Sequence, residues 1–139
     1  MIREVVRDWI VGEDPGMSAW QLAGDDGVLL VPNDLLNGAP PWTVRCYDIT
    51  LAPEDAITPD SNSEGNANSN NWVTKTSGTI DGYWTRGGQG YNVRHYIENQ
   101  DYTTTPFVAG HEYRFVYTVE TDDWGNIILV RRGRCLPQK

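Results

Sequence analysis

Segment 111–121 alternates apolar and polar side chains with a period of two, and this pattern constrains the fold more than any other feature of the chain. Tyr113, Phe115, Tyr117 and Val119 are apolar, and most positions between them carry charged or hydroxyl groups. A period of two is typical of a strand with one buried face and one solvated face. The sequence therefore predicts a long β-strand here.

The remainder of the chain also contains strand-like segments, but they are shorter. Apolar and β-branched runs are separated by glycine-rich or aspartate-rich turns, and 14 Gly and 8 Pro interrupt the chain often. No convincing interior helix is found, and strands at this spacing are typical of all-β proteins. We therefore expect one domain, residues 1–139, with an all-β fold that is an antiparallel β-sandwich or barrel. The expected further strands are 20–22, 28–31, 42–51, 72–76, 78–85, 91–98 and 127–130.

The N-terminal segment is ambiguous. Ile2, Val5, Val6, Trp9 and Ile10 follow a helical spacing, but the segment is short, lacks an N-cap residue and is rich in β-branched side chains. Since β-branched residues favour strands, we interpret this segment as a strand.

Residues 58–71 form a polar tract in which one alanine and one proline are the only apolar side chains. Such a segment cannot offset its ordering entropy by burial, so it is a solvated loop or is ordered by something outside this fold. We expect one long polar loop here that contacts a partner. Its Asp60–Gly65 part resembles the start of a calcium loop, but position twelve is Asn71 instead of a bidentate Glu. We therefore expect no metal site.

Charge is distributed unevenly along the chain. The net charge is −8, yet the last nine residues, 131–139, carry four basic groups and no acid. An acidic body disfavours nucleic-acid binding. We expect residues 131–139 to form a basic C-terminal tail that meets the acidic surface of a neighbouring subunit.

The chain contains few candidates for catalysis. None of the P-loop, dinucleotide, nucleophile-elbow or zinc-protease motifs occurs. The histidines, His95 and His111, fall in expected strands and are interpreted as structural. Cys46 and Cys135 are either reduced and buried or joined in one bridge, and we favour the reduced state. We expect no enzyme activity and no cofactor; a small hydrolase would need a Cys–His pair or converging carboxylates.

Neither a secretory leader nor a membrane span is expected. No charged segment followed by an apolar run and a small-residue cleavage site is found at the start of the sequence. The longest apolar run, 28–31, is too short to cross a bilayer.

Aromatic residues crowd the region after the polar tract, between Trp72 and Tyr102. Exposed Trp and Tyr side chains can stack on sugar rings, and they can equally form a core or anchor a subunit interface. Alternation within 78–85 predicts that Trp84 is buried and Tyr83 exposed. Trp124 falls at an expected hairpin tip, where its own domain offers little to bury it, so we expect it to contact another chain.

Two stretches resemble a known group of proteins. They are 77–84, a glycine-punctuated strand after a long polar loop, and 106–115, where a glycine precedes a long amphipathic strand. Together they cover about a fifth of the chain. They resemble small all-β structural proteins of tailed-phage virions, namely tail-tube subunits, capsid decoration (cement) proteins and baseplate modules. The resemblance implies a non-enzymatic protein that forms rings, trimers or lattices and holds its neighbours with loops and termini.

The resemblance thus implies a structural assembly protein of a phage virion, assembled in the host cytoplasm. Its partners would be other virion proteins and copies of itself. The alternative is a carbohydrate- or receptor-binding module that uses the aromatic region. The expected interface residues are Asp60, Asn62, Glu64, Asn68, Asn70, Trp72, Tyr83, Trp124, Arg131, Arg132 and Arg134.

Overall fold

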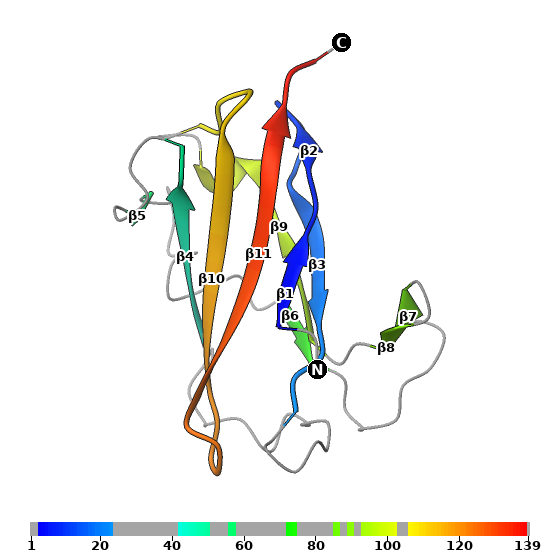
Figure 1. Ribbon diagram of the computed structural model, residues 1–139, viewed down its shortest axis with the longest axis vertical. Helices are drawn as coiled ribbons and strands as arrows, with labels where there is room; N and C mark the ends of the chain where they lie inside the picture. Colours follow the sequence, from blue (N-terminus) through cyan, green and yellow to red (C-terminus); the bar gives the residue numbers. More distant parts are fainter. Residues whose placement is uncertain are drawn as a thin grey trace.

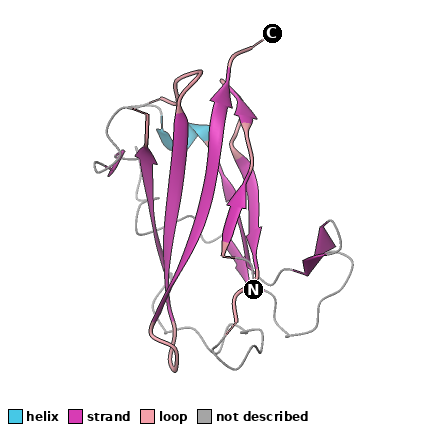
Figure 2. Cartoon of the chain, viewed as in Figure 1, coloured by secondary structure: helices cyan, strands magenta, loops and turns pink. Residues whose placement is uncertain are grey.

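The computed structural model describes residues 3–23, 42–50, 56–57, 72–74, 85–86, 89–90, 93–102 and 106–138. These residues are mostly strand, with one short 3-10 turn, η3 (Asn99–Tyr102) (Figure 2). The all-β expectation is confirmed. The strands are β1 (Glu4–Val6), β2 (Trp9–Ile10), β3 (Gly16–Trp20), β4 (Trp42–Asp48), β5 (Ala56–Ile57), β6 (Trp72–Thr74), β7 (Thr85–Arg86), β8 (Gln89–Gly90), β9 (Val93–Ile97), β10 (Glu112–Glu120) and β11 (Asn126–Leu136).

The largest sheet is built around the β10–β11 hairpin. Its strand order is β1-β11-β10-β4-β5, and β2 also pairs with β11 (Figure 1). Val116 of β10 lies opposite Arg45 of β4 on one side and opposite Val130 of β11 on the other. The expected strands 42–51 and 111–121 are present as β4 and β10. The alternation predicted for β10 is confirmed, because its four odd positions are buried.

The N-terminal segment is a strand in two pieces, as we favoured, but its direction differs from the antiparallel expectation. Both β1 and β2 run parallel to β11, so the large sheet is mixed. Between them, Arg7 and Asp8 leave the ladder and pass over Gly133. A side-chain carbon at Gly133 would overlap the Arg7 carbonyl group, so this passage requires glycine.

The prediction of a C-terminal tail is wrong. Strand β11 extends to Leu136, and its residues pair with β10, β1 and β2. Its burial alternates along its length, with Leu129, Arg131 and Cys135 fully buried. Residues 131–136 are therefore part of the sheet, and the parity of each position decides whether its side chain faces the core.

A second sheet has the order β3-β9-β6, and β7 pairs with β8 in a small hairpin. Aromatic side chains join the first two sheets. The ring centre of Trp20 on β3 lies 4.8 Å from the ring centre of Tyr117 on β10, and the ring centre of His95 on β9 lies 5.4 Å from it. A second aromatic group surrounds Phe107, whose ring centre is 5.2 Å from Trp9 and 4.9 Å from Tyr102. Burial of such side chains supplies most of the stabilisation of a core.

Both cysteines lie in this core. Cys46 and Cys135 are buried and are not joined in a disulfide, in agreement with the reduced state that we favoured. The expected strand 28–31, the tract 58–71 with its Asp60–Gly65 pattern, and Tyr83 and Trp84 lie outside the described residues.

Candidate functional site

Six of the eleven predicted interface residues lie outside the described residues. They are Asp60, Asn62, Glu64, Asn68, Asn70 and Tyr83. For Trp72 the structure describes the backbone, which pairs with His95 in the three-stranded sheet. The other four predicted residues, Trp124, Arg131, Arg132 and Arg134, lie in the β10–β11 hairpin and can be tested against the fold.

Arg131 was expected to be an exposed basic group, and this expectation is wrong. Its side chain is fully buried at 0% exposure. The guanidinium donates to the Pro15 carbonyl oxygen at 2.7 Å, the Arg7 carbonyl oxygen at 3.0 Å and Ser18 Oγ at 3.0 Å. It therefore binds the N-terminal segment and the start of β3 to the large sheet, and it is not available to another chain.

Arg131 belongs to a polar group inside the core, together with His95, Tyr117 and Ser18. His95 Nδ1 lies 2.6 Å from the Tyr117 hydroxyl. Burial, assisted by the charge of Arg131, lowers the pKa of His95 to about 3, so this histidine is neutral near pH 7. Burial also lowers the pKa of Arg131 to about 10. This arrangement supports the structural interpretation of His95.

Trp124 lies near the tip of the β10–β11 hairpin, but the hairpin partly buries it. Its backbone N–H donates to Thr121 Oγ1 at 3.0 Å, and Gly125 completes the turn with φ +66°. The indole packs against the hydrophobic core. Trp124 is thus a partly buried cap on the core, and the premise that its own domain cannot cover it is wrong.

Arg132 and Arg134 are exposed, as predicted, and they lie on the outer face of the large sheet. We use this name for the side of β1, β11, β10 and β4 that points away from the core. In one row across this face, Tyr47, Arg114, Arg132 and Val6 are neighbours on successive strands. Arg114 lies 5.6 Å from the centre of the Tyr47 ring, in the geometry of a cation–π contact.

The middle of the outer face is apolar. Val116 and Val130 lie side by side, and Ile128 follows on β11 with 44% of its surface exposed. At the edge, Val6 is 61% exposed and Leu136 is 36% exposed. A solvated sheet face normally carries polar side chains, so this row of aliphatic groups is unusual for a face that meets only water.

A hollow of about 210 Å³ lies at the edge of the outer face, where the chain leaves the ladder between β1 and β2. Both charged and aliphatic groups line it. The lining residues are Val6, Asp8, Glu112, Gly133, Arg134 and Leu136.

The charges of the outer face are only weakly engaged within the chain. Arg132 lies 3.5 Å from Glu4 and 3.6 Å from Glu112; the side chains are 45% exposed for Arg132, 56% for Glu4 and 35% for Glu112. Exposed pairs of this kind contribute about 0–1 kcal/mol, so they leave Arg132 free to contact a partner. Within the described ranges, the Arg134 side chain makes no hydrogen bond or ion pair.

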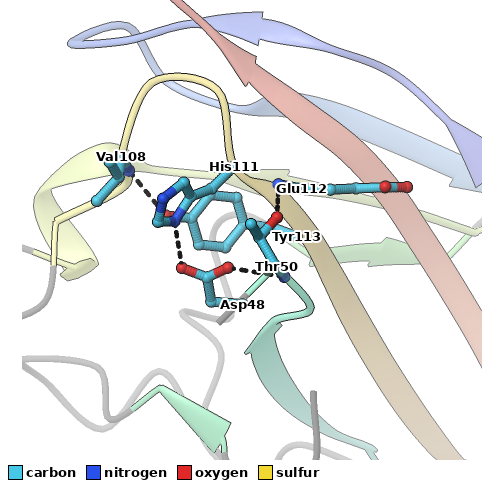
Figure 3. A network of polar contacts seen from close by, with 6 residues as sticks. All are labelled: Asp48, Thr50, Val108, His111, Glu112 and Tyr113. Carbon is cyan, nitrogen blue, oxygen red and sulfur yellow. Dashed lines mark hydrogen bonds and ion pairs between the residues drawn. The ribbon is translucent and has the colours of Figure 1, made fainter. Parts of the chain in front are cut away.

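A polar network joins the ends of β4 and β10 next to this face (Figure 3). Asp48 lies 2.7 Å from His111 Nδ1 and accepts a hydrogen bond from the Thr50 backbone at 3.1 Å. Thr50 Oγ1 in turn accepts from the Glu112 backbone at 2.9 Å. The Tyr113 hydroxyl accepts from the Val108 backbone at 2.7 Å, and burial raises the pKa of Tyr113 to about 12.

A carboxylate that orients a histidine through Nδ1 is half of a general-base pair. Among the described residues, Asp48 is the one side chain that hydrogen-bonds to His111. The network fixes the turn before β10 and the position of Glu112, which borders the outer face. We therefore interpret it as the support of that face.

The described part of the chain offers no group of three or more metal-ligating side chains. It also contains no helix that is long and apolar enough to cross a membrane.

Sequence reasoning placed Arg132 and Arg134 at the surface but missed the face they belong to. Tyr47, Val130 and Ile128 became part of the site only through the pairing of β4, β10 and β11. The alternation along β11 was the signal that could have shown this, since Ile127, Leu129 and Cys135 lie on the same side of the strand as Arg131.

Searches for similar proteins, among family models, curated proteins and solved structures, found no match to this chain.

Proposed function

We propose that this protein is a non-enzymatic structural assembly protein with a β-sandwich fold, and that it packs against neighbouring subunits through the outer face of its large sheet. One observation carries the proposal. This face combines exposed arginines with a central row of aliphatic side chains, Val116, Val130 and Ile128.

That composition is typical of protein interfaces. Interface centres are depleted of Lys and Glu and enriched in Arg, Tyr and apolar groups. Here Arg114 lies on Tyr47, and Arg132 borders Val6. Since both long hairpin strands hold the face rigid, little ordering entropy opposes its docking.

We further propose that the assembly is a virion of a tailed phage, with other virion proteins and copies of this chain as partners. The support is the resemblance of 77–84 and 106–115 to decoration and tail proteins. The second stretch contains Phe107, a core residue, and Gly110, whose φ of +89° turns the chain into β10.

The carbohydrate-binding alternative gains less support. Tyr102 is buried against Phe107, so it is not available to stack on a sugar. Tyr96 donates its hydroxyl to Asp14 at 3.0 Å. The remaining aromatic residues of that region either lie outside the described ranges or have undescribed side chains.

Light scattering of the purified chain across protein concentration tests the assembly proposal. We expect a mass above that of the monomer at high concentration. Ile128→Lys, which places a charge at the centre of the face, should reduce that mass. Val108→Lys is the matched control, because Val108 is similarly exposed at 46% but lies in the loop before β10. A monomer at all concentrations would contradict the proposal.

A further inference from the structure

We propose that the contact between the two larger sheets is an acid-sensitive junction: protonation of His95 opens the second sheet away from Tyr117, while the β10–β11 hairpin stays folded. We use the name sheet junction for the contacts of Ser18, Trp20 and His95 with Tyr117 and Arg131. This opening is independent of the proposed function, because it concerns the inner side of the large sheet and not the outer face.

His95 lies at the middle of the second sheet and is buried in the sheet junction. On the central strand β9 it lies opposite Ser18 of β3 on one side and Trp72 of β6 on the other. Its Nδ1 is 2.6 Å from the Tyr117 hydroxyl, and the two rings meet edge to face. One titratable ring of the second sheet thus contacts the central strand of the large sheet.

The charge that acts on His95 in the junction is positive. Burial and the Arg131 guanidinium of β11 lower the pKa of His95 to about 3. Tyr117 faces it from β10, with Cys46 of β4 close by, and burial raises the pKa of the Tyr117 hydroxyl, which therefore stays neutral. The residues opposite His95 on β3 and β6 carry no titratable group. Protonation of His95 therefore adds a second buried cation beside Arg131.

The rest of the junction allows the second sheet to open from one end. The start of β3 is held by Arg131, which donates to the Pro15 carbonyl oxygen at 2.7 Å and to Ser18 Oγ at 3.0 Å. At the other end of β3, Trp20 Nε1 donates to the Val130 carbonyl oxygen at 3.0 Å. We expect the contacts of Trp20 and His95 to separate while those near Pro15 remain.

The β10–β11 hairpin does not need the junction in order to stay folded. Its strands pair continuously from Glu112 to Glu120, and its other aromatic group, around Phe107, packs against Trp9 of the same sheet. The strands of the second sheet are only three to five residues long. Short elements of this kind open at a lower free energy than the whole domain.

The pKa of His95 sets the size of the effect. In the open state the ring is hydrated and its pKa returns to its ordinary value of 6.5, so the open state binds a proton that the closed state does not. The closed state is therefore favoured above pH 6.5 and loses this advantage as pH falls towards 3. The equilibrium constant for opening should rise about ten-fold per pH unit below 6.5, and roughly 200-fold between pH 7 and pH 4.

Thiol labelling tests the opening, because the two cysteines lie in different parts of the core. Cys46 lies close enough to Tyr117 to raise its pKa, whereas Cys135 is the strand partner of Trp9 in the other aromatic group. Dithiodipyridine, which reacts with thiols in acid, is added to the full chain between pH 7 and pH 4. Mass spectrometry of digests then gives the labelling rate at each cysteine, relative to the urea-unfolded chain at the same pH. We expect roughly 200-fold faster relative labelling of Cys46 at pH 4, with Cys135 still protected.

His95→Asn should remove the acceleration at Cys46, since asparagine does not titrate in this range. His111→Asn, at the histidine that contacts Asp48, is the matched control and should keep it. Circular dichroism at pH 7 shows whether each variant is folded. If His95→Asn is not, the wild-type slope decides, because one decade per pH unit corresponds to uptake of one proton.

Three results would overturn the acid-sensitive junction. Equal acceleration at Cys46 and Cys135 would mean that acid unfolds the whole domain. Labelling of Cys46 that does not change with pH would mean that the junction stays closed. An unchanged slope in folded His95→Asn would assign the opening to another group.

Discussion

Arg131 shows how one residue can join separate parts of this chain. It is a cation buried without a described carboxylate partner, and backbone carbonyls and a serine hydroxyl satisfy it. Its guanidinium also lies 5.5 Å from the Trp9 ring centre. Because its acceptors come from Arg7, Pro15 and Ser18, its loss would leave several buried oxygens without donors.

We expect Arg131→Met to reduce the free energy of unfolding by roughly 2–5 kcal/mol, because methionine fills part of the space but donates no hydrogen bond. Urea denaturation measures the change. Arg132→Met, one position along on the exposed side, is the matched control and should change stability by about 0.5 kcal/mol or less in dilute, monomeric protein. Equal effects at the two positions would contradict the buried role of Arg131.

His95 makes stability depend on pH. Its pKa is about 3 in the folded protein and near its ordinary value of 6.5 in the unfolded chain. Between these values the unfolded chain binds a proton that the folded protein does not, so stability falls as pH decreases from about 6.5 towards 3. The expected slope from this group is about 1.4 kcal/mol per pH unit.

His95→Asn should remove that part of the slope, because asparagine does not titrate in this range and keeps a polar group near Nδ1. Denaturation curves of both proteins at several pH values between 4 and 7 measure the difference, and their slopes should differ by about 1.4 kcal/mol per pH unit. Parallel stability profiles would show that His95 is not the group responsible.

At the scale of elements, the N-terminal segment and β11 depend on each other. Arg7 N–H donates to the Arg132 carbonyl at 2.9 Å and Val11 N–H donates to the Leu136 carbonyl at 2.8 Å, on either side of the passage over Gly133. The segment can lie this close because Gly133 has no side chain.

Gly133→Ala should therefore detach the segment from β11 and destabilise the protein by roughly 1–3 kcal/mol. Hydrogen exchange should become faster at the Arg7 and Val11 amides and stay slow in the middle of β10. Gly110→Ala is a useful control: its φ of +89° causes strain in its own loop, but no atom within 4 Å would be displaced. If Gly133→Ala leaves exchange at Arg7 unchanged, the close passage is not what holds the segment.

Sequence patterns predicted the elements better than their connections. The alternation in 111–121 fixed the inward side of β10, because that signal is local. Parallel pairing of β1 with β11 joins residues more than a hundred positions apart, and no local pattern carries it. Arg131 was predicted to be exposed because its side chain is charged, although its position in the alternating pattern of β11 points inward. The pairing of β11 with β10 continues well past Val130 and turns that arginine inward.

At the scale of the whole molecule, an acidic chain places Arg45, Arg114, Arg132 and Arg134 on one sheet face. The sequence shows seven basic residues outside 131–139, and it also identified Arg132 and Arg134 as interface candidates. Their grouping with Tyr47, Val116 and Ile128 could not be predicted, since it depends on which strands are neighbours in the sheet. This grouping is the basis of our proposal that another subunit covers the face.

Thiol labelling of Ile128→Cys tests whether another subunit covers the outer face. The native cysteines are buried, at 1% exposure for Cys46 and 0% for Cys135, so they should contribute little background. Val108→Cys provides an exposed control away from the face. We predict that labelling at position 128 slows as protein concentration rises, while labelling at position 108 keeps its rate. Rates that are independent of concentration at both positions would contradict a subunit interface on the outer face.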